Sequence, residues 1–310
     1  MINVYIKCHS RPVYLDRCLT SLERCAPGYG RVIVLNDGLE GACIDRLLDR
    51  HPGIDLRNSP NVGRNPEEPR ADPARFWVDE ISRDGGQHLL LIEEDTWFTR
   101  PFNLPLLVRN VALNNTLSCR LYWHSNPQLA PPEDVVLTAI VDDDTIIDYC
   151  SFEIESALAH YKLFPIAQAL YRTDYWLNAY QGLATWTDER AVLERALDFT
   201  LACAKAGELV HFARLDREAM RHSASTTGRD DAGGRGVLEK IDPAPYNRVL
   251  NACWLSGELD AMAGFSAQID ADDFGIVPHQ RGRPLGNGHA VVQHHDRLGQ
   301  VHHEGHVVLD

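Results

Sequence analysis

Three groups of polar residues in the first hundred residues have side chains suited to a phosphorylated ligand. Residues 9–12, 36–38 and 93–95 each follow directly on a short apolar run. An aspartate in such a place can accept hydrogen bonds from a base or a ribose, and adjacent carboxylates bind hard divalent cations through oxygen. The three groups together predict a site for a nucleotide diphosphate and its metal ion.

Each group also has a plainer interpretation when it is considered alone. Asn36-Asp37-Gly38 is typical of a simple turn, and a run of carboxylates is typical of a solvated loop. However, residues 93–95 continue the apolar run 88–92 without a break. Three carboxylates at the end of a buried strand cost free energy unless they are solvated, paired or metal-bound. At this position we therefore favour a functional site.

Alternating strand and helix patterns predict an α/β fold. The apolar run 88–92 has the character of a central strand that is buried on both faces. Alternation of this kind is typical of a mostly parallel sheet with helices on both faces, in which ligands bind beyond the carboxyl ends of the strands. We expect strands at residues 2–6, 31–35, 54–57, 88–92, 118–124 and 167–172, and helices at 15–22, 44–50, 74–82, 104–113 and 189–205.

The chain predicts one main domain and a C-terminal extension. We place the domain at residues 1–225, with halves at 1–100 and 101–225. The glycine-rich segment 226–236 begins an extension at 226–310 that is rich in Gly and His. Within this extension, residues 290–293 and 307–309 are expected to pair as a β-hairpin.

Composition restricts the classes of partner. The formal net charge of −14 opposes broad binding to nucleic acid or to anionic membranes, although a nucleic-acid acceptor is only disfavoured. The eight cysteines are scattered, which favours reduced, buried thiols. We identify neither a leader peptide nor an apolar run of the roughly 18 residues that a transmembrane span needs. These features predict a cytoplasmic protein without a transmembrane segment.

The order and spacing of the motifs resemble the GT-A glycosyltransferases of family 2, over about the first hundred residues. Residues 4–12, 32–38, 58–65 and 90–95 are similar to the first strand with its Arg-Pro turn, the nucleoside-binding strand, the N-x-G segment and the D-x-D motif of that family. The resemblance implies a GT-A, Rossmann-like fold and a nucleotide-diphospho-sugar donor, with a UDP-sugar as the first expectation. It makes residues 1–225 the catalytic domain, with the donor half at 1–100 and the acceptor half at 101–225. It places donor binding on Ser10, Arg11, Asp37, Gly38, Arg64, Glu93 and Glu94.

The resemblance also implies a bound Mn²⁺ or Mg²⁺. The motif is Glu-Glu-Asp here, so the first position departs from the family's usual Asp, and Asp95 becomes the expected direct metal ligand. The family often adds a late histidine. We prefer His222 to His211 for this role, because a loop histidine is easier to direct at a metal than one in a strand.

Inverting members of the family carry a catalytic carboxylate near the start of a downstream helix. Asp188 occupies the matching place and is the expected base toward an acceptor hydroxyl, with Glu189 as the substitute. Asp188 is equally suited to capping the helix that follows it. The aromatic residues Trp176, Tyr180 and Trp186 could face a sugar, but large aromatic side chains more often pack in a core.

The predicted activity is transfer of a sugar from the nucleotide donor to a saccharide or another hydroxyl acceptor, with inversion. Two alternatives stay open. A nucleotidyltransferase is the weaker one, because residues 8–12 contain no glycine for a phosphate-binding loop. A non-catalytic module that binds a nucleotide sugar or a glycan is the other, and the altered Glu-Glu-Asp motif suggests it.

Overall fold

The structure is a computed structural model that describes residues 1–39, 41–65, 68–122, 136–142, 145–151, 164, 167–215, 218–222 and 243–261. The chain divides into two compact units, Met1–Ser223 and Ala224–Asp310. The described part of the second unit consists of helices α8 (Pro243–Ser256) and α9 (Glu258–Ala261). The expected C-terminal hairpin and the glycine-rich segment 226–236 lie outside the described residues. Within the described residues, no helix combines the length and apolar character that crossing a bilayer requires.

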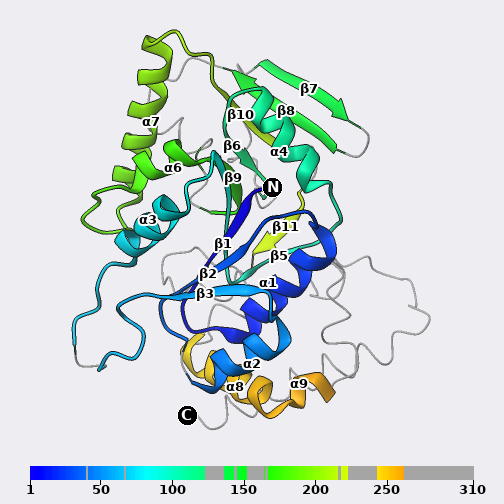
Figure 1. Ribbon diagram of the computed structural model, residues 1–310, viewed down its shortest axis with the longest axis vertical. Coiled ribbons are helices and arrows are strands. Elements are labelled where there is room, and N and C mark those ends of the chain that lie inside the picture. The colour runs from blue at the N-terminus through cyan, green and yellow to red at the C-terminus, as the bar shows by residue number, and fades with distance from the viewer. Residues whose placement is uncertain are drawn as a thin grey trace, which may run out of the picture. The chain divides into compact units, whose positions relative to one another are not determined.

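The first unit is built on a nine-stranded sheet with the order β3-β2-β1-β4-β9-β6-β10-β8-β7 (Figure 1). Strands β1 to β4 run parallel to one another, and β6 runs parallel to β10. Only β9 and β8 oppose the other strands of this sheet. The predicted α/β fold with a mostly parallel sheet is confirmed. The strands are β1 (Asn3–Cys8), β2 (Val32–Asn36), β3 (Ile54–Asn58), β4 (His88–Glu93), β6 (Thr116–Arg120), β7 (Val136–Asp142), β8 (Thr145–Ser151), β9 (Ala169–Arg172) and β10 (His211–Leu215).

Strand register brings the polar motifs to one edge. Cys8 at the end of β1 lies opposite Asn36 of β2, and Asn36 lies opposite Asn58 of β3. Lys7 lies opposite Glu93 of β4. The loops that carry the three polar motifs therefore leave the sheet side by side, as expected for the carboxyl ends of parallel strands.

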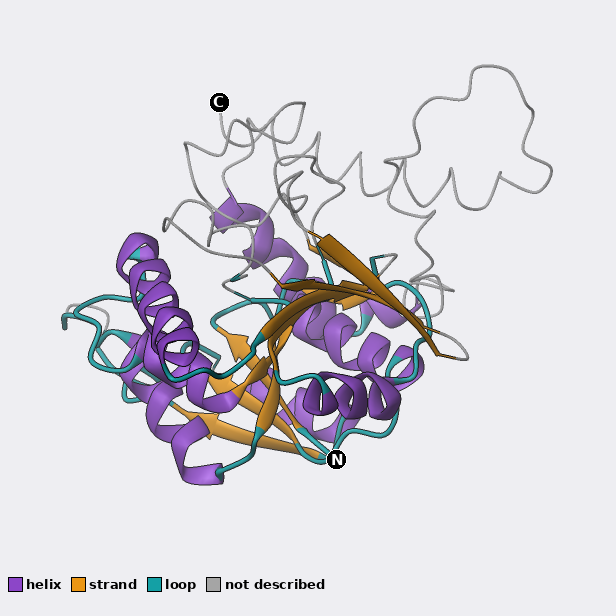
Figure 2. Ribbon diagram, turned by 90° about the horizontal axis from the view of Figure 1, so that it is seen from above, coloured by secondary structure: helices purple, strands orange, loops and turns teal. Residues whose placement is uncertain are grey.

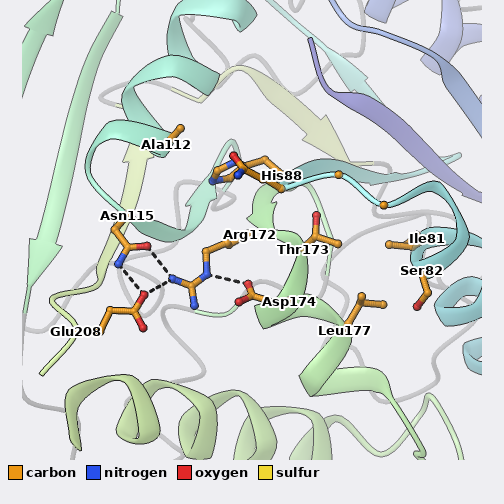
Figure 3. A pocket seen from close by; sticks show the side chains of 13 residues that line it. Ile81, Ser82, His88, Ala112, Asn115, Arg172, Thr173, Asp174, Leu177 and Glu208 are labelled. Carbon is orange, nitrogen blue, oxygen red and sulfur yellow. Dashed lines mark hydrogen bonds and ion pairs between the residues drawn. The ribbon is translucent and has the colours of Figure 1, made fainter. Parts of the chain in front are cut away.

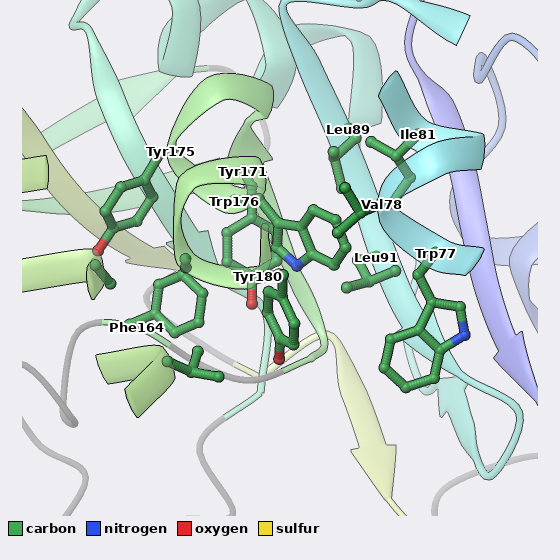
Figure 4. Packing of buried hydrophobic residues seen from close by; sticks show 14 of the residues in the cluster. Trp77, Val78, Ile81, Leu89, Leu91, Phe164, Tyr171, Tyr175, Trp176 and Tyr180 are labelled. Carbon is green, nitrogen blue, oxygen red and sulfur yellow. The ribbon is translucent and has the colours of Figure 1, made fainter. Parts of the chain in front are cut away.

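Helices cover both faces of the sheet (Figure 2). One face packs against α3 (Pro73–Asp84), α6 (Thr173–Tyr180) and α7 (Glu189–Lys205), and Figure 4 shows the aromatic core between them. The other helices among the described residues of this unit are α1 (Pro12–Cys25), α2 (Ala42–Arg50) and α4 (Leu104–Leu113). Trp176 and Tyr180 are fully buried and stack at 4.6 Å between ring centroids, so both belong to the core.

A separate two-stranded sheet pairs β5 (Thr96–Phe98) with β11 (Met220–His222) in antiparallel register. The sequence pattern predicted neither strand, because each has only three residues. The expectation that His222 lies in a loop is wrong, since it is the last residue of β11. The pairing explains how a residue far along the chain is fixed beside residue 95: His222 lies opposite Thr96.

The buried histidine at the end of α2 gives a pH-dependent contribution to stability. His51 contacts Asp16 at 2.8 Å and Glu23 at 3.2 Å, both on α1. Burial acts to lower the pKa of His51, but these two carboxylates outweigh it and raise the pKa above its ordinary value. A raised native pKa stabilises the protein below the unfolded pKa, and that stability is lost as pH rises through the native pKa.

We therefore expect the free energy of unfolding to fall as pH rises above about 6.5, the ordinary pKa of histidine. His51→Gln should remove this pH dependence and cost about 1–3 kcal/mol at pH 6. Urea unfolding of both proteins at pH 6 and pH 9 measures the difference. An equal loss in the variant at both pH values would contradict the assignment to His51.

Candidate functional site

Glu93, Asp95 and His222 form a cluster of side chains that could hold a metal ion. One ligand atom from each lies within 4.8 Å of the other two. The Nε2 atom of His222 is 3.3 Å from Oδ2 of Asp95 and 3.9 Å from Oε2 of Glu93. Two carboxylates and an imidazole that converge in this way fit the donor set of a divalent cation such as Mn²⁺.

The charge of the cluster also suits a cation. Burial acts to lower the pKa of His222, but its hydrogen bond to Asp95 and the charges of Asp95 and Glu93 outweigh this and raise the pKa. The carboxylates therefore hold a local negative potential strong enough to favour a positive charge on a largely buried imidazole. The same negative potential would stabilise a bound divalent cation.

Two residues that the sequence analysis missed hold Glu93 in place. Lys7 of β1 forms a 2.8 Å ion pair with Oε1 of Glu93, and Gln168 donates a hydrogen bond to Oε2 at 3.2 Å. Gln168 has a φ of 60°, a backbone conformation that residues other than Gly rarely adopt. It reaches this edge because β9 runs antiparallel to β4 and begins where β4 ends. Lys7 was assigned no role because it lies inside an apolar strand.

Glu94, the middle residue of the motif, faces into the protein. Its Oε2 accepts a hydrogen bond from the backbone N–H of His9 at 2.8 Å, and its Oε1 accepts one from Nε of Arg11 at 2.6 Å. Arg11 also donates to Oδ2 of Asp95 at 2.9 Å. These contacts tie the loop after β1 to the loop after β4. A donor-binding role for Glu94 stays a prediction.

Because Glu94 is 1% exposed, removing its carboxylate should destabilise the protein strongly. We expect Glu94→Ala to cost about 3–5 kcal/mol of unfolding free energy, since it leaves the charge of Arg11 with one partner fewer in a buried place. The exposed Glu68→Ala, which loses one surface ion pair with Arg64, is the matched control and should cost less than about 1 kcal/mol. Equal costs in urea unfolding would contradict a structural role for Glu94.

Asp37 lies in the next loop of the same edge and organises its surroundings. Its Oδ1 accepts hydrogen bonds from Ser59 at 2.5 Å and Asn61 at 2.8 Å, and its Oδ2 contacts Arg70 at 2.9 Å. Ser59 and Asn61 belong to the segment 58–65 that the N-x-G resemblance identified, whereas Arg70 lies beyond it. The sequence pattern did not single out Arg70, which is half-exposed and pairs with Asp37.

The other residues expected to bind the donor lie along this edge with differing contacts. A side chain at Gly38 would place its Cβ 2.8 Å from the carbonyl oxygen of His9, so the loops after β1 and β2 approach each other too closely for any residue but Gly. Ser10 is exposed. Arg64 is also exposed and pairs with Glu68. The structure thus brings Arg11, Glu93, Glu94, Asp95 and His222 into one connected cluster, with Asp37 and Gly38 in the adjoining loop.

A chain of contacts leads from the cluster to the segment before α7. The ammonium of Lys7 lies 4.9 Å from the ring centroid of Trp77 on α3, and this ring packs edge-on against Trp186 at 5.8 Å. Asp72, the cap of α3, accepts a hydrogen bond from the backbone N–H of Trp186 at 2.9 Å. The segment that carries the candidate base is therefore fixed to the same helix that supports Lys7.

Asp188 directly precedes α7 and Glu189 is its first residue, and the two side chains have different surroundings. Asp188 caps the helix, since its carboxylate accepts a hydrogen bond from the backbone N–H of Ala191 at 3.0 Å, which confirms the predicted cap. Glu189 is half-buried and is the first residue of the helix. Burial first, and then the charges of Glu93 and Glu189, raise the pKa of Tyr180.

Comparisons with known proteins give structural similarity only. No protein-family model and no curated protein sequence matches the chain. Glucosyl-3-phosphoglycerate synthase from Mycobacterium tuberculosis, in complex with Mn²⁺, UDP and phosphoglyceric acid, is similar over 83% of this chain and 78% of its own, with 14% identity and a TM-score of 0.45. S. aureus TarS 1–349 is similar over 88% of this chain and 77% of its own, with 13% identity and a TM-score of 0.42.

Two further glycosyltransferase structures belong to proteins that extend well beyond the region matched by this chain. The bifunctional glycosyltransferase WbbM matches over 63% of this chain and 37% of its own, with 13% identity and a TM-score of 0.38. The mannosyltransferase PcManGT from Pyrobaculum calidifontis, in complex with GDP-Man and Mn²⁺, matches over 39% and 35%, with 14% identity and a TM-score of 0.31. The chain thus spans little more than a third of these two proteins. At TM-scores below 0.5, none of these similarities assigns a donor or an acceptor to this chain.

Proposed function

We propose that this chain is a glycosyltransferase that moves a sugar from a metal-bound nucleotide diphosphate to an acceptor hydroxyl, with inversion at the anomeric carbon. The observation that carries the proposal is the Glu93, Asp95 and His222 cluster at the carboxyl edge of a parallel sheet, beside the loop of Asp37. A cation site beside a buried aspartate at this edge suits a nucleotide diphosphate, because the cation can bind the phosphates and the aspartate can accept hydrogen bonds from the nucleoside.

In this proposal the donor lies across the loops after β1, β2 and β4. Asp37 accepts hydrogen bonds from the nucleoside, while the half-exposed Arg70 faces the same part of the ligand. Ser10, Gly38 and Arg64 line the neighbouring rim. The Lys7 and Gln168 contacts keep Glu93 oriented toward the cation rather than toward solvent. A UDP-sugar is the first donor to test.

Glu93, Asp95 and His222 would hold the cation, and their chemistry favours Mn²⁺. Mg²⁺ sites in proteins are built from oxygen ligands, whereas an imidazole nitrogen is better suited to a transition metal. When bound, the ion supplies charge stabilisation for the departing diphosphate.

The acceptor would approach from the segment before α7. We place the general base on Glu189, the first residue of α7, because the carboxylate of Asp188 is engaged in capping the helix. The base would take the proton from the acceptor hydroxyl as the oxygen attacks the anomeric carbon. The net charge of −14 favours a saccharide or another small hydroxyl acceptor over nucleic acid.

Release of nucleoside diphosphate from a panel of UDP-, GDP-, CDP- and TDP-sugars tests the activity. With Mn²⁺ and a mixture of saccharide acceptors, we expect release from one nucleotide class, and we expect EDTA to abolish it. Binding of a nucleotide sugar with no turnover for any acceptor would favour the non-catalytic module. Equal release with and without EDTA would contradict the metal-dependent mechanism.

A further inference from the structure

A cavity of about 670 Å³ lies at the opposite edge of the sheet, where the parallel strands begin (Figure 3). His88 begins β4, Asn115 directly precedes β6, and Arg172 ends the antiparallel β9. The volume falls within the range of small-molecule sites. Apolar side chains of Ile81, Ala112 and Leu177 contribute to the same wall as these polar groups.

Four polar side chains of the cavity already form hydrogen bonds with one another. Arg172 donates to Asp174 at 2.7 Å, to Glu208 at 2.7 Å and to Asn115 at 2.7 Å, and Asn115 donates to Glu208 at 2.9 Å. With one guanidinium and two carboxylates, this group carries a net charge of about −1. The carboxylates oppose an anionic ligand, and both are already bonded to Arg172, so neither is left to pair with a cationic one. A neutral ligand is therefore the best match to the charges.

Two further atoms in the cavity wall point to such a ligand. Among the described residues, Oγ1 of Thr173 and Nε2 of His88 are buried and have no hydrogen-bond partner. Thr173 is only 7% exposed, so leaving its hydroxyl unsatisfied costs free energy. Burial first, and then Arg172, lower the pKa of His88, which keeps its ring neutral and able to both donate and accept.

We propose that this cavity is a second binding site, distinct from the carboxyl-edge cluster, and that its ligand is a neutral mono- or disaccharide. Sugar hydroxyls both donate and accept hydrogen bonds, which matches the mixture of donors and acceptors that Thr173, His88, Asn115 and the carboxylates provide. The C–H faces of a sugar ring match the apolar wall. The site does not depend on the proposed transfer reaction, because none of its lining residues belongs to the carboxyl-edge cluster.

Ligand-observed NMR and calorimetry on the full chain test this site. The probes are glucose, galactose, mannose, maltose and cellobiose, with glucuronate as the anionic control and glucosamine as the cationic one. We expect saturable binding of at least one neutral sugar at millimolar concentrations or below. Thr173→Val should weaken that binding about 3- to 10-fold, which corresponds to one lost hydrogen bond. Its thermal unfolding midpoint should not fall, since the hydroxyl has no partner to lose.

A second variant keeps the test decisive if the effect of Thr173→Val is small. Ser82 is exposed on α3 at the cavity wall, so Ser82→Trp should fill the cavity without disturbing the core and should abolish sugar binding. Asp95→Ala, at the other edge, should leave sugar binding at this site unchanged. The proposal is overturned if no neutral sugar binds, if only glucuronate or glucosamine binds, or if Ser82→Trp binds sugar as well as the native protein does.

Discussion

Replacing Asp95 by alanine should abolish Mn²⁺-dependent binding of a nucleoside diphosphate. Asp95 is 3% exposed and contacts both His222 and Arg11 through the same carboxylate oxygen. Its loss removes one of three converging ligands and the partner that orients the imidazole. We expect the metal-dependent affinity to fall by about 100-fold or more, because even changes outside the ligands themselves cost 10- to 100-fold in metal sites. Mn²⁺ titration followed by electron paramagnetic resonance measures it.

Asp37→Asn is the matched control for this variant. It should weaken nucleoside binding equally with and without Mn²⁺, because Asp37 contacts Ser59, Asn61 and Arg70 and none of the three cation ligands in the contacts described above. Full Mn²⁺ affinity in Asp95→Ala would show that the cation binds elsewhere. The same metal dependence in both variants would remove the division of roles between the two loops.

The second large effect is expected at the start of α7. Glu189→Gln should lower the transfer rate by about 10²–10⁴-fold while keeping donor affinity, which is the typical contribution of a general base. Asp188→Asn should retain most of the activity, because Asn caps helices as well as Asp does. Steady-state rates with saturating donor and acceptor, together with calorimetric donor affinities, measure both variants.

The two variants also distinguish Glu189 from Asp188 as the general base. If Asp188→Asn loses turnover and Glu189→Gln keeps it, the base is the capping residue, and our placement is wrong. If both variants keep the full rate, neither carboxylate takes the acceptor proton. Thermal unfolding of both proteins controls for damage to α7, and we expect unchanged midpoints.

Sequence reasoning predicted the parallel half of the sheet well because its signals are local. The apolar run 88–92 and the β-branched runs before it fix strand positions by themselves, and parallel pairing places their carboxyl ends at one edge. The same logic predicted that the loops with residues 9–12, 36–38 and 93–95 meet at this edge. The cap at Asp188 was equally local, since it depends only on the residue type before a helix.

The parts that were missed depend on contacts between distant segments. Strands β5 and β11 are too short to have a recognisable pattern, and only their pairing brings His222 beside Asp95. Gln168 reaches Glu93 because β9 reverses direction at this edge, which no local spacing reveals. A lysine within an apolar strand could have signalled the Lys7 ion pair, since buried lysines are almost always paired.

The central claim is that the carboxyl edge of the sheet binds a nucleoside diphosphate together with a divalent cation. Calorimetric titration of the full chain with UDP, GDP, CDP and TDP, each with and without Mn²⁺, tests it most directly. We predict that one nucleotide binds, UDP being the first expectation, and that Mn²⁺ strengthens its binding. Failure of all four to bind with Mn²⁺ present, or affinities that do not change with the metal, would contradict the account.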